Sequence, residues 1–482
     1  MARSIKTNFS LSLTNTVIGL LYPVITFPYI SRVLHPDGVG LIQFLQSVVS
    51  YFALFAALGI PLYAVKEIAK YKNDEKERNK TTAEILILFC VQTLIIYSVL
   101  LISGFVVNQF HENLVLFLIL SFHLFLVAIG CDWFYQGVEE FKYITIRSLL
   151  VKFLSLIALF VFVKSENDIY VYAILIVIAE AGNYVINFIH LRKFVSFRSI
   201  NFRELDIKRH IKPAFEIFLL NVIVSIYINL DSVMLGFMKG NESLGYYTAA
   251  TKITKAFTGF TSALGFVVFP RIAGYFKEGN MESFRDLINT SLSFTMFVLI
   301  PVSVGLFACA PPLISVFCGS DYSSSILTLR ILSPIIVFIS VSGILGTNAL
   351  YAMDRQRVVM ISTASGAILN MILNFSLIPS LSQDGAAIAS LVAELSVAIT
   401  MLYFGNKYIK LAFVDKCLLQ VILSTIVMAT VIVVMNKYFL MKPLITIALD
   451  VVVGSIVYFG LLFAVKNRFS GQAIDIIKTK LS

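Results

Sequence analysis

Charged side chains within long apolar stretches are the residues of this chain best suited to chemistry. A charge at the centre of an apolar helix costs about 2.5–3.5 kcal/mol on insertion scales, so each of these residues requires a partner or a polar cavity. The basic members predict a site for a phosphate or another anion, and the acidic members predict either ion coupling or structural pairing. The basic members are Arg32, Arg147, Lys152, Lys252, Lys255 and Arg330, and the acidic members are Glu180, Asp231 and Glu394.

Lys252 and Lys255 are the basic pair with the clearest spacing. They are three positions apart, which places them on one face of a helix. Counted from Tyr246 at the predicted outer end, they lie about 9 and 14 Å deep. The pair predicts a cationic wall that receives a diphosphate or an acidic sugar, and the alternative is that both lysines extend to the outer headgroups. The greater depth of Lys255 favours the cavity for that residue.

The remaining basic candidates have competing interpretations. Arg147 and Lys152 are five positions apart, so they point about 140° apart around a helix and cannot face one partner. Arg32 and Arg330 lie near the ends of apolar stretches. The planar guanidinium suits a phosphate, but anchoring to lipid headgroups is the simpler interpretation for these two.

The acidic candidates are interpreted mainly as structural. Glu180 and Glu394 lie near the middle of two apolar stretches, at matching positions in the two halves of the chain. A matched carboxylate that bonds a neighbouring helix is favoured over a proton-coupling site for that reason. Asp231 lies near the end of another stretch, where pairing with a nearby lysine would compensate it.

The composition shows what must position these residues. Hydrophobic residues make up 58% of the 482 and charged residues only 14%, whereas soluble proteins carry about 25% charged residues. A span needs about 20 apolar residues, and this rule predicts an all-α, polytopic membrane protein with fourteen spans. They are 9–30, 41–65, 83–106, 114–136, 143–163, 169–190, 213–237, 246–270, 288–308, 326–349, 358–378, 385–404, 411–435 and 443–465.

The distribution of basic residues predicts the orientation. With a cytoplasmic N-terminus, 28 of the 38 Lys and Arg residues fall on the cytoplasmic side, in loops or near the end of a span, and five fall in outer loops. The segments Lys66–Lys80 and Arg192–Lys212 hold six and seven of them. The positive-inside rule therefore predicts that both termini are cytoplasmic. The net charge of +10 reflects this loop bias and does not indicate a nucleic-acid partner.

An internal repeat predicts two related halves. Gly40 and Gly245 each open a span, at an offset of 205. The later matches, each 214 positions apart, are Glu140 with Asp354, Glu180 with Glu394, and Lys193 with Lys407. Since six spans are an even number, the halves are parallel repeats. The predicted parts are an N-lobe of six helices (1–193), a basic cytoplasmic linker (194–212), a C-lobe of six helices (213–406), and two further helices with a cytoplasmic tail (407–482).

The motifs of most enzymes and cofactor sites are missing from the sequence. It contains no phosphate-binding GxxxxGK[ST], no DxD, no HExxH and no GxSxG, and its five cysteines form no CxxC pair. These observations indicate a transporter and not an enzyme, with no cofactor and no metal site.

Several segments resemble one family of transporters. The carriers of the resemblance are Tyr29–Gly40 (YISRVLHPDGVG), Asp132–Gly137 (DWFYQG), Leu230–Gly236 (LDSVMLG) and Leu244–Ala250 (LGYYTAA). In their order along the chain they resemble the O-antigen (Wzx-type) flippases, in the polysaccharide branch of the multidrug/oligosaccharidyl-lipid/polysaccharide exporter superfamily. One departure is His35, where the family pattern usually has glycine.

The resemblance implies a function and a fold. Such a flippase moves an undecaprenyl-diphosphate-linked oligosaccharide from the cytoplasmic to the outer leaflet of the bacterial inner membrane. The family fold is two six-helix lobes arranged in a V that open alternately to the two sides. The implied partners are membrane lipids, the lipid-linked substrate, and the polymerase and glycosyltransferases of polysaccharide biosynthesis. The alternatives are a multidrug or organic-ion antiporter of the same fold and, less favoured, a membrane-embedded polymerase.

Overall fold

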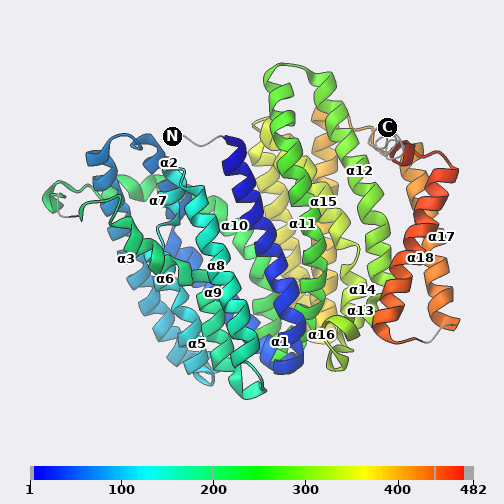
Figure 1. Ribbon diagram of the computed structural model, residues 1–482, viewed down its shortest axis with the longest axis horizontal. Helices are drawn as coiled ribbons and strands as arrows, with labels where there is room; N and C mark the ends of the chain where they lie inside the picture. The colour runs from blue at the N-terminus through cyan, green and yellow to red at the C-terminus, as the bar shows by residue number, and fades with distance from the viewer. Residues whose placement is uncertain (1–4, 198–199, 439–440, 472–482) are drawn as a thin grey trace. The chain divides into compact units, whose positions relative to one another are not determined.

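Helices account for almost all of the ordered structure. The computed structural model describes residues 5–197, 200–438 and 441–471, and these residues form helices joined by short turns, with no β-strand among them (Figure 1). The helices of the first half are α1 (Ile5–Ala57), α2 (Ile60–Lys70), α3 (Glu75–Val106), α4 (Asn108–His111), α5 (Leu114–Ser121), α6 (His123–Ile129), α7 (Asp132–Gly137), α8 (Phe141–Phe162) and α9 (Ile169–Leu191). They are followed by α10 (Lys208–Lys239), α11 (Asn241–Lys277), α12 (Met281–Ala308), α13 (Ala310–Phe317), α14 (Ser325–Leu332), α15 (Ile335–Gly343), the π-helical turn η5 (Ile344–Leu350), α16 (Gln356–Ile409), α17 (Lys416–Tyr438) and α18 (Pro443–Ala464).

The predicted fold class is confirmed: the chain is an all-α, multi-pass membrane protein. Eleven helical segments of the described residues are long and apolar enough to cross a membrane. The first of them, Leu21–Lys70, covers parts of both predicted spans 9–30 and 41–65, and α16 covers 358–378 and 385–404. The predicted number of fourteen spans stays a prediction.

Two helix breaks have the same backbone conformation. Within α1, His35 has φ 54° and ψ 178°, and between α10 and α11 Gly240 has φ 82° and ψ −173°. The two residues are 205 positions apart, which is also the offset that matches Gly40 with Gly245. This region of φ and ψ is accessible essentially only to glycine. His35 therefore occupies a conformation that suits the glycine usual at this position of the family pattern.

The turns that precede α8 and α16 also share one geometry. The amide of Glu140 donates to the carbonyl of Tyr135, and the amide of Arg355 donates to that of Leu350, both at 2.8 Å. The residue before each donor has a positive φ: Glu139 at 64° and Asp354 at 56°. The equivalent of Asp354 is thus Glu139, one residue from the predicted match. These local similarities support the repeat, and the predicted division into two six-helix lobes stays a prediction.

The chain forms two compact units. Unit 1 comprises residues 1–26 and 33–242, and unit 2 comprises 27–32 and 243–482. Helix α10 belongs to unit 1 by its contacts, although most of its residues lie in the predicted C-lobe (213–406), and a short segment of α1 belongs to unit 2.

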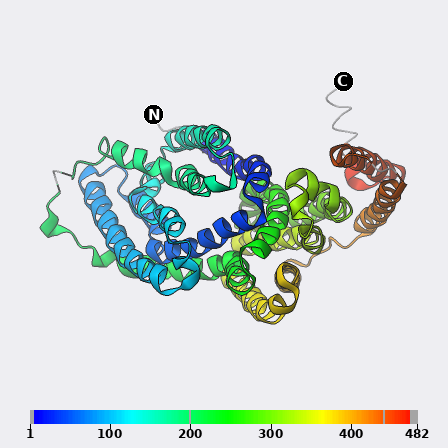
Figure 2. The same cartoon turned by 90° about the horizontal axis from the view of Figure 1, so that it is seen from below.

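Unit 1 has a core near the end that carries the Lys66–Lys80 loop. Helix α2 packs against α7, and α8 packs against α9. Figure 2 shows the helices of the first half of the chain, coloured blue to green, from below. Contact between α2 and α7 is close, because a Cβ on Gly137 would lie 2.8 Å from the side chain of Ile68. The fully buried side chains of this core include Ile60, Phe89 and Phe134.

Unit 2 has a main core and a separate C-terminal core. In the second, α17 packs against both α12 and α18, and Figure 1 shows α17 and α18 side by side. The hydroxyl of Tyr458 donates to the carbonyl of Phe297 at 2.6 Å, and Asn436 donates to the buried carboxylate of Asp450 at 2.9 Å. These bonds satisfy polar groups within the apolar helix packing.

Candidate functional site

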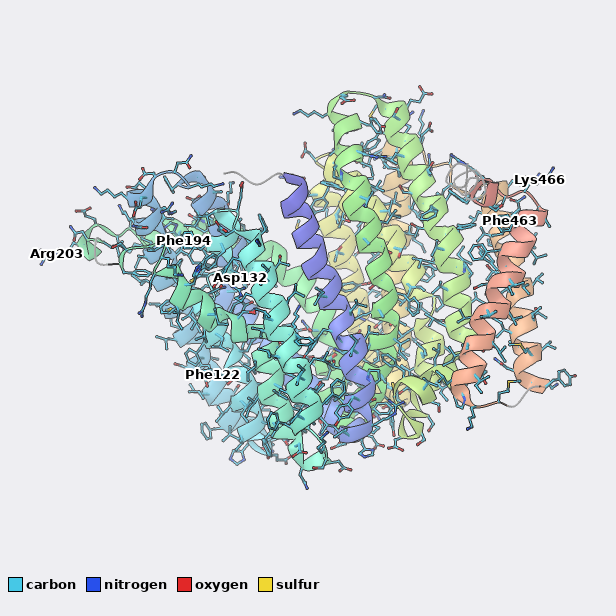
Figure 3. The ribbon with its side chains drawn as sticks, in the orientation of Figure 1. Phe122, Asp132, Phe194, Arg203, Phe463 and Lys466 are labelled. Carbon is cyan, nitrogen blue, oxygen red and sulfur yellow. The ribbon has the colours of Figure 1, made fainter. Side chains whose placement is uncertain are left out.

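Arg147 is paired inside unit 1. Its side chain, only 5% exposed, donates from Nη2 to Oδ1 of Asp132 at 2.9 Å. Asn187 donates to the same oxygen at 2.6 Å, and the guanidinium lies 5.3 Å from the centre of the Tyr143 ring. Asp132 begins α7, after the helix break at Gly130 and Cys131 (Figure 3). Arg147 is therefore compensated by a carboxylate of the DWFYQG motif, and its predicted role in substrate binding stays a prediction.

Lys152 lies on another face of α8 and has other neighbours. Its ammonium is close to Gly19 of α1, where a Cβ would lie 3.6 Å from Nζ. Glu180 is the carboxylate that interacts electrostatically with Lys152. The different partners of Arg147 and Lys152 agree with their predicted separation of about 140° around the helix.

Glu180 is part of a mixed polar cluster. Its side chain is 55% exposed. Oε1 accepts a hydrogen bond from Gln46 at 3.5 Å, and Oε2 lies 3.9 Å from Nε2 of His123. Together with Lys152, these groups place a carboxylate, an amide, an imidazole and an ammonium within unit 1, among helices that are otherwise apolar.

The basic candidates of unit 2 are at separate places. Lys252 is half-buried and Lys255 is exposed, on the same helix α11. Arg32 donates to the carbonyls of Pro28 and Val316, which ties its segment of α1 to the end of α13.

Arg330 also binds a backbone carbonyl, since its Nε donates to Phe307 at 3.3 Å and its guanidinium lies 5.5 Å from the centre of the Phe307 ring. It also lines a cavity of about 530 Å³ with Asn436 and Lys437. Arg32 and Arg330 thus both bind backbone carbonyls, and their predicted anchoring to lipid headgroups stays a prediction. Their predicted contact with substrate stays a prediction.

The two other acidic candidates lie apart from Glu180. Asp231 is 9% exposed on α10 of unit 1, and Glu394 is half-buried on α16 of unit 2. Neither unit brings all of its predicted candidates into one cluster.

The sequence prediction missed a buried ionic network in unit 1. Glu84, with no exposed side-chain surface, accepts from Nε of Arg209 at 3.0 Å and from Nε2 of His210 at 2.8 Å. The Tyr63 hydroxyl lies 2.7 Å from Nδ1 of His210, and the backbone amide of Asp206 donates to Glu84 at 2.8 Å. The available signal was a carboxylate one residue into the predicted span 83–106, opposite a basic linker.

Burial favours the neutral form of the histidine in this network. It lowers the pKa of His210, which lies ahead of the predicted span 213–237, below its ordinary value of 6.5. A neutral ring satisfies both nitrogens when Nε2–H donates to Glu84 and Nδ1 accepts from Tyr63. The charge of Glu84 is then compensated by Arg209.

Solved structures place the fold in a class of membrane transporters. A structure described as "Lipid II flippase MurJ, inward closed conformation" superposes with a TM-score of 0.75 at 18% identity, covering 94% of this chain and 97% of that one. The inward-facing structure of a multidrug resistance MATE family transporter of the MOP superfamily gives a TM-score of 0.57 at 13% identity, covering 85% and 96%. At these identities the likeness concerns the fold.

Sequence comparison then gives the family. The family described as "Polysaccharide biosynthesis protein" matches residues 5–276, more than half of the chain, and the MatE family matches 217–376. The chain belongs to the polysaccharide biosynthesis protein family. A relative in Escherichia coli (strain K12), named "Putative O-antigen transporter", is 27% identical over 391 residues, which cover 80% of this chain and 92% of that protein. The resemblance seen in the sequence is confirmed.

Proposed function

We propose that this protein is a flippase for lipid-linked oligosaccharides. It moves an undecaprenyl-diphosphate-linked repeat unit from the cytoplasmic to the outer leaflet by alternating access. Similarity to the Escherichia coli relative over most of both chains supports this proposal most directly. The fold, shared with a lipid II flippase, agrees with it.

The charges within the helices suit an anionic lipid headgroup. A diphosphate cannot leave water at acceptable cost unless fixed positive charge replaces its hydration. Lys252, which is half-buried, and Lys255, which is exposed, are basic side chains on α11 of unit 2 that can supply this charge. We assign the diphosphate to these residues, and anchoring of helix ends to Arg32 and Arg330.

The basic loops support an inner-membrane location with both termini in the cytoplasm. The partners in this assignment are the membrane lipids, the lipid-linked substrate, and the glycosyltransferases and polymerase that make and use it. No catalytic step is assigned to the chain.

A multidrug antiporter of the same fold is the alternative. Organic cations require an acidic cavity, whereas the basic candidates within the helices outnumber the acidic ones. The lower TM-score of the multidrug transporter, 0.57 against 0.75, also favours the flippase.

Deletion of the gene in its own host tests the proposal. The lipid-linked oligosaccharide should accumulate in the inner leaflet, and expression of the wild-type chain should restore surface polysaccharide. A chain that inserts at normal levels, does not restore polysaccharide and confers resistance to cationic drugs would contradict the proposal and support the antiporter.

A further inference from the structure

Helix α9 has two exposed faces of opposite character. At 100° per residue, the exposed apolar side chains of its central part lie on one side of the helix, and Glu180 points about 170° away from their centre. These apolar side chains are Ile174, Ile178, Val185, Ile186 and Ile189. An exposed isoleucine face suits lipid, so the exposed carboxylate lies on the side of α9 opposite the lipid-compatible face.

The Glu180 side of α9 carries several polar and aromatic side chains between apolar ones. Tyr172, Asn183, Tyr184 and Asn187 fall with Glu180 within an arc of about 120°. Outside α9, Gln46 and His123 approach the carboxylate from α1 and α6. Since Asn183 and Asn187 are buried, the accessible part of this polar wall of unit 1 consists of Glu180, Tyr172 and Tyr184, together with Gln46 and His123.

A cavity adjoins this wall. It has a volume of about 350 Å³, and its lining includes Phe89, Asp132, Trp133, Gln136 and Tyr184. This volume is near the lower end of the range of about 300–1,000 Å³ found for small-molecule sites.

Tyr184 joins the cavity to the polar wall. Its ring lies directly on Gly130, where a Cβ would be 2.7 Å from the ring, so only glycine fits at the break between α6 and α7. Tyr184 also lies one helical turn from Glu180, on the same side of α9. The cavity that Tyr184 lines is therefore next to the Glu180 cluster along α9, and the two form one candidate site.

The charged groups of this site are paired with opposite charges, so the site disfavours binding of an anion or a cation. Asp132 is compensated by Arg147, and Glu180 interacts with Lys152. A phosphate would meet two carboxylates, and a cation would meet two basic groups close behind them. What remains is a nearly neutral surface rich in hydrogen-bond acceptors and donors, with aromatic rings beside them.

We propose that this part of unit 1 binds an uncharged sugar ring of the substrate. Carboxylate and amide groups of Asp132, Gln136 and Glu180 bind its hydroxyls, and the ring of Tyr184 packs on its apolar face. The inference rests on the proposed flippase function and adds a site for the sugar, separate from the basic residues assigned to the diphosphate. Sites that hydrogen-bond a hydroxyl reject analogues that lack it by large factors, so these residues set sugar specificity.

Binding of free sugars to the purified full-length chain in nanodiscs tests this proposal. The probes are D-glucose, D-galactose, N-acetyl-D-glucosamine and L-rhamnose, detected by saturation-transfer difference NMR. At least one sugar should bind the wild-type chain, with no competition from inorganic pyrophosphate. The signal should fall at least fivefold in Gln136→Leu and Glu180→Leu, and remain in Glu394→Gln, the matched carboxylate change in unit 2.

Several outcomes separate this proposal from its alternatives. Absence of binding by any probe, or binding that both leucine variants retain, would overturn the sugar site. Loss of transport in Glu180→Gln with full sugar binding would overturn the assignment of Glu180 to sugar and support ion coupling. Restoration of surface polysaccharide by the wild-type chain is measured separately. It tests the flippase proposal independently of the sugar site. Monodispersity of each variant on size-exclusion chromatography verifies its folding.

Discussion

Glu84 Oε2 and His210 Nε2 lie 2.8 Å apart in unit 1, although 126 residues separate them in the chain. Glu84 is on α3, and His210 is in the first turn of α10, within the predicted basic linker (194–212). With Arg209 on the same carboxylate, the contact fixes the start of α10 to α3. The linker is thereby held by a buried ionic network.

Replacement of this carboxylate should destabilise the protein. Glu84→Leu leaves Arg209 without its counter-ion, and the expected loss is about 2–3 kcal/mol because the guanidinium is partly exposed. The measurement is the thermal unfolding temperature in detergent, which should fall by several degrees. Glu75→Leu, which replaces an exposed acid on the same helix, is the control and should change little. An unchanged unfolding temperature in Glu84→Leu would contradict the anchoring role.

His35 should be a site of stored backbone strain. His35→Gly removes a side chain from a conformation that suits glycine and should stabilise the chain by about 1 kcal/mol. The gain outweighs the loss of the exposed contact with Glu166, since surface pairs contribute about 0–1 kcal/mol. The opposite change, Gly240→Ala, should destabilise the chain by a similar amount. Equal unfolding temperatures for all three proteins would contradict the equivalence of the two breaks.

The Arg147–Asp132 pair should depend on both partners. In Arg147→Met, Asp132 keeps its hydrogen bond from Asn187 but loses its counter-ion. Removal of one partner of a buried ion pair typically lowers the free energy of unfolding by about 3–5 kcal/mol. The double variant Arg147→Met with Asp132→Asn removes both charges and should recover much of this loss. A double variant less stable than either single variant would show that the pair does not act as a unit.

The sequence predicted the class of this fold well because its signals are local. Apolar stretches predict helices by composition alone, and the repeat offset of 205 found at Gly40 also relates His35 to Gly240. The turn before α16 required a one-residue correction, since the residue equivalent to Asp354 is Glu139.

Contacts between residues far apart in the chain could not be predicted from the sequence. A carboxylate at Glu84 and a guanidinium at Arg209 are visible in the chain, but nothing local says that they meet. The same holds for Arg32, whose contact with Val316 depends on how α1 packs. The Glu180 face of α9 was missed although its spacing is helical, because Glu180 was considered alone and not with Tyr172, Asn183 and Tyr184.

The orientation of the chain gives a prediction about labelling. In a variant without native cysteines, a cysteine at Lys72 should resist a membrane-impermeant thiol reagent in intact cells, because the basic loops are retained in the cytoplasm. A cysteine at Asp321 should react. The same reagent should label both positions after permeabilisation. Labelling of Lys72→Cys in intact cells would reverse the proposed topology.

The most direct test of the flippase account is the charge at Lys255. In a flippase-null strain, Lys255→Glu should abolish surface polysaccharide while the protein remains at normal levels in the membrane fraction, because a carboxylate would repel the diphosphate. Lys255→Arg should retain much of the activity, since positive charge is preserved. Full restoration of polysaccharide by a Lys255→Glu protein present at wild-type levels would contradict the cationic path and leave Lys255 as a headgroup anchor.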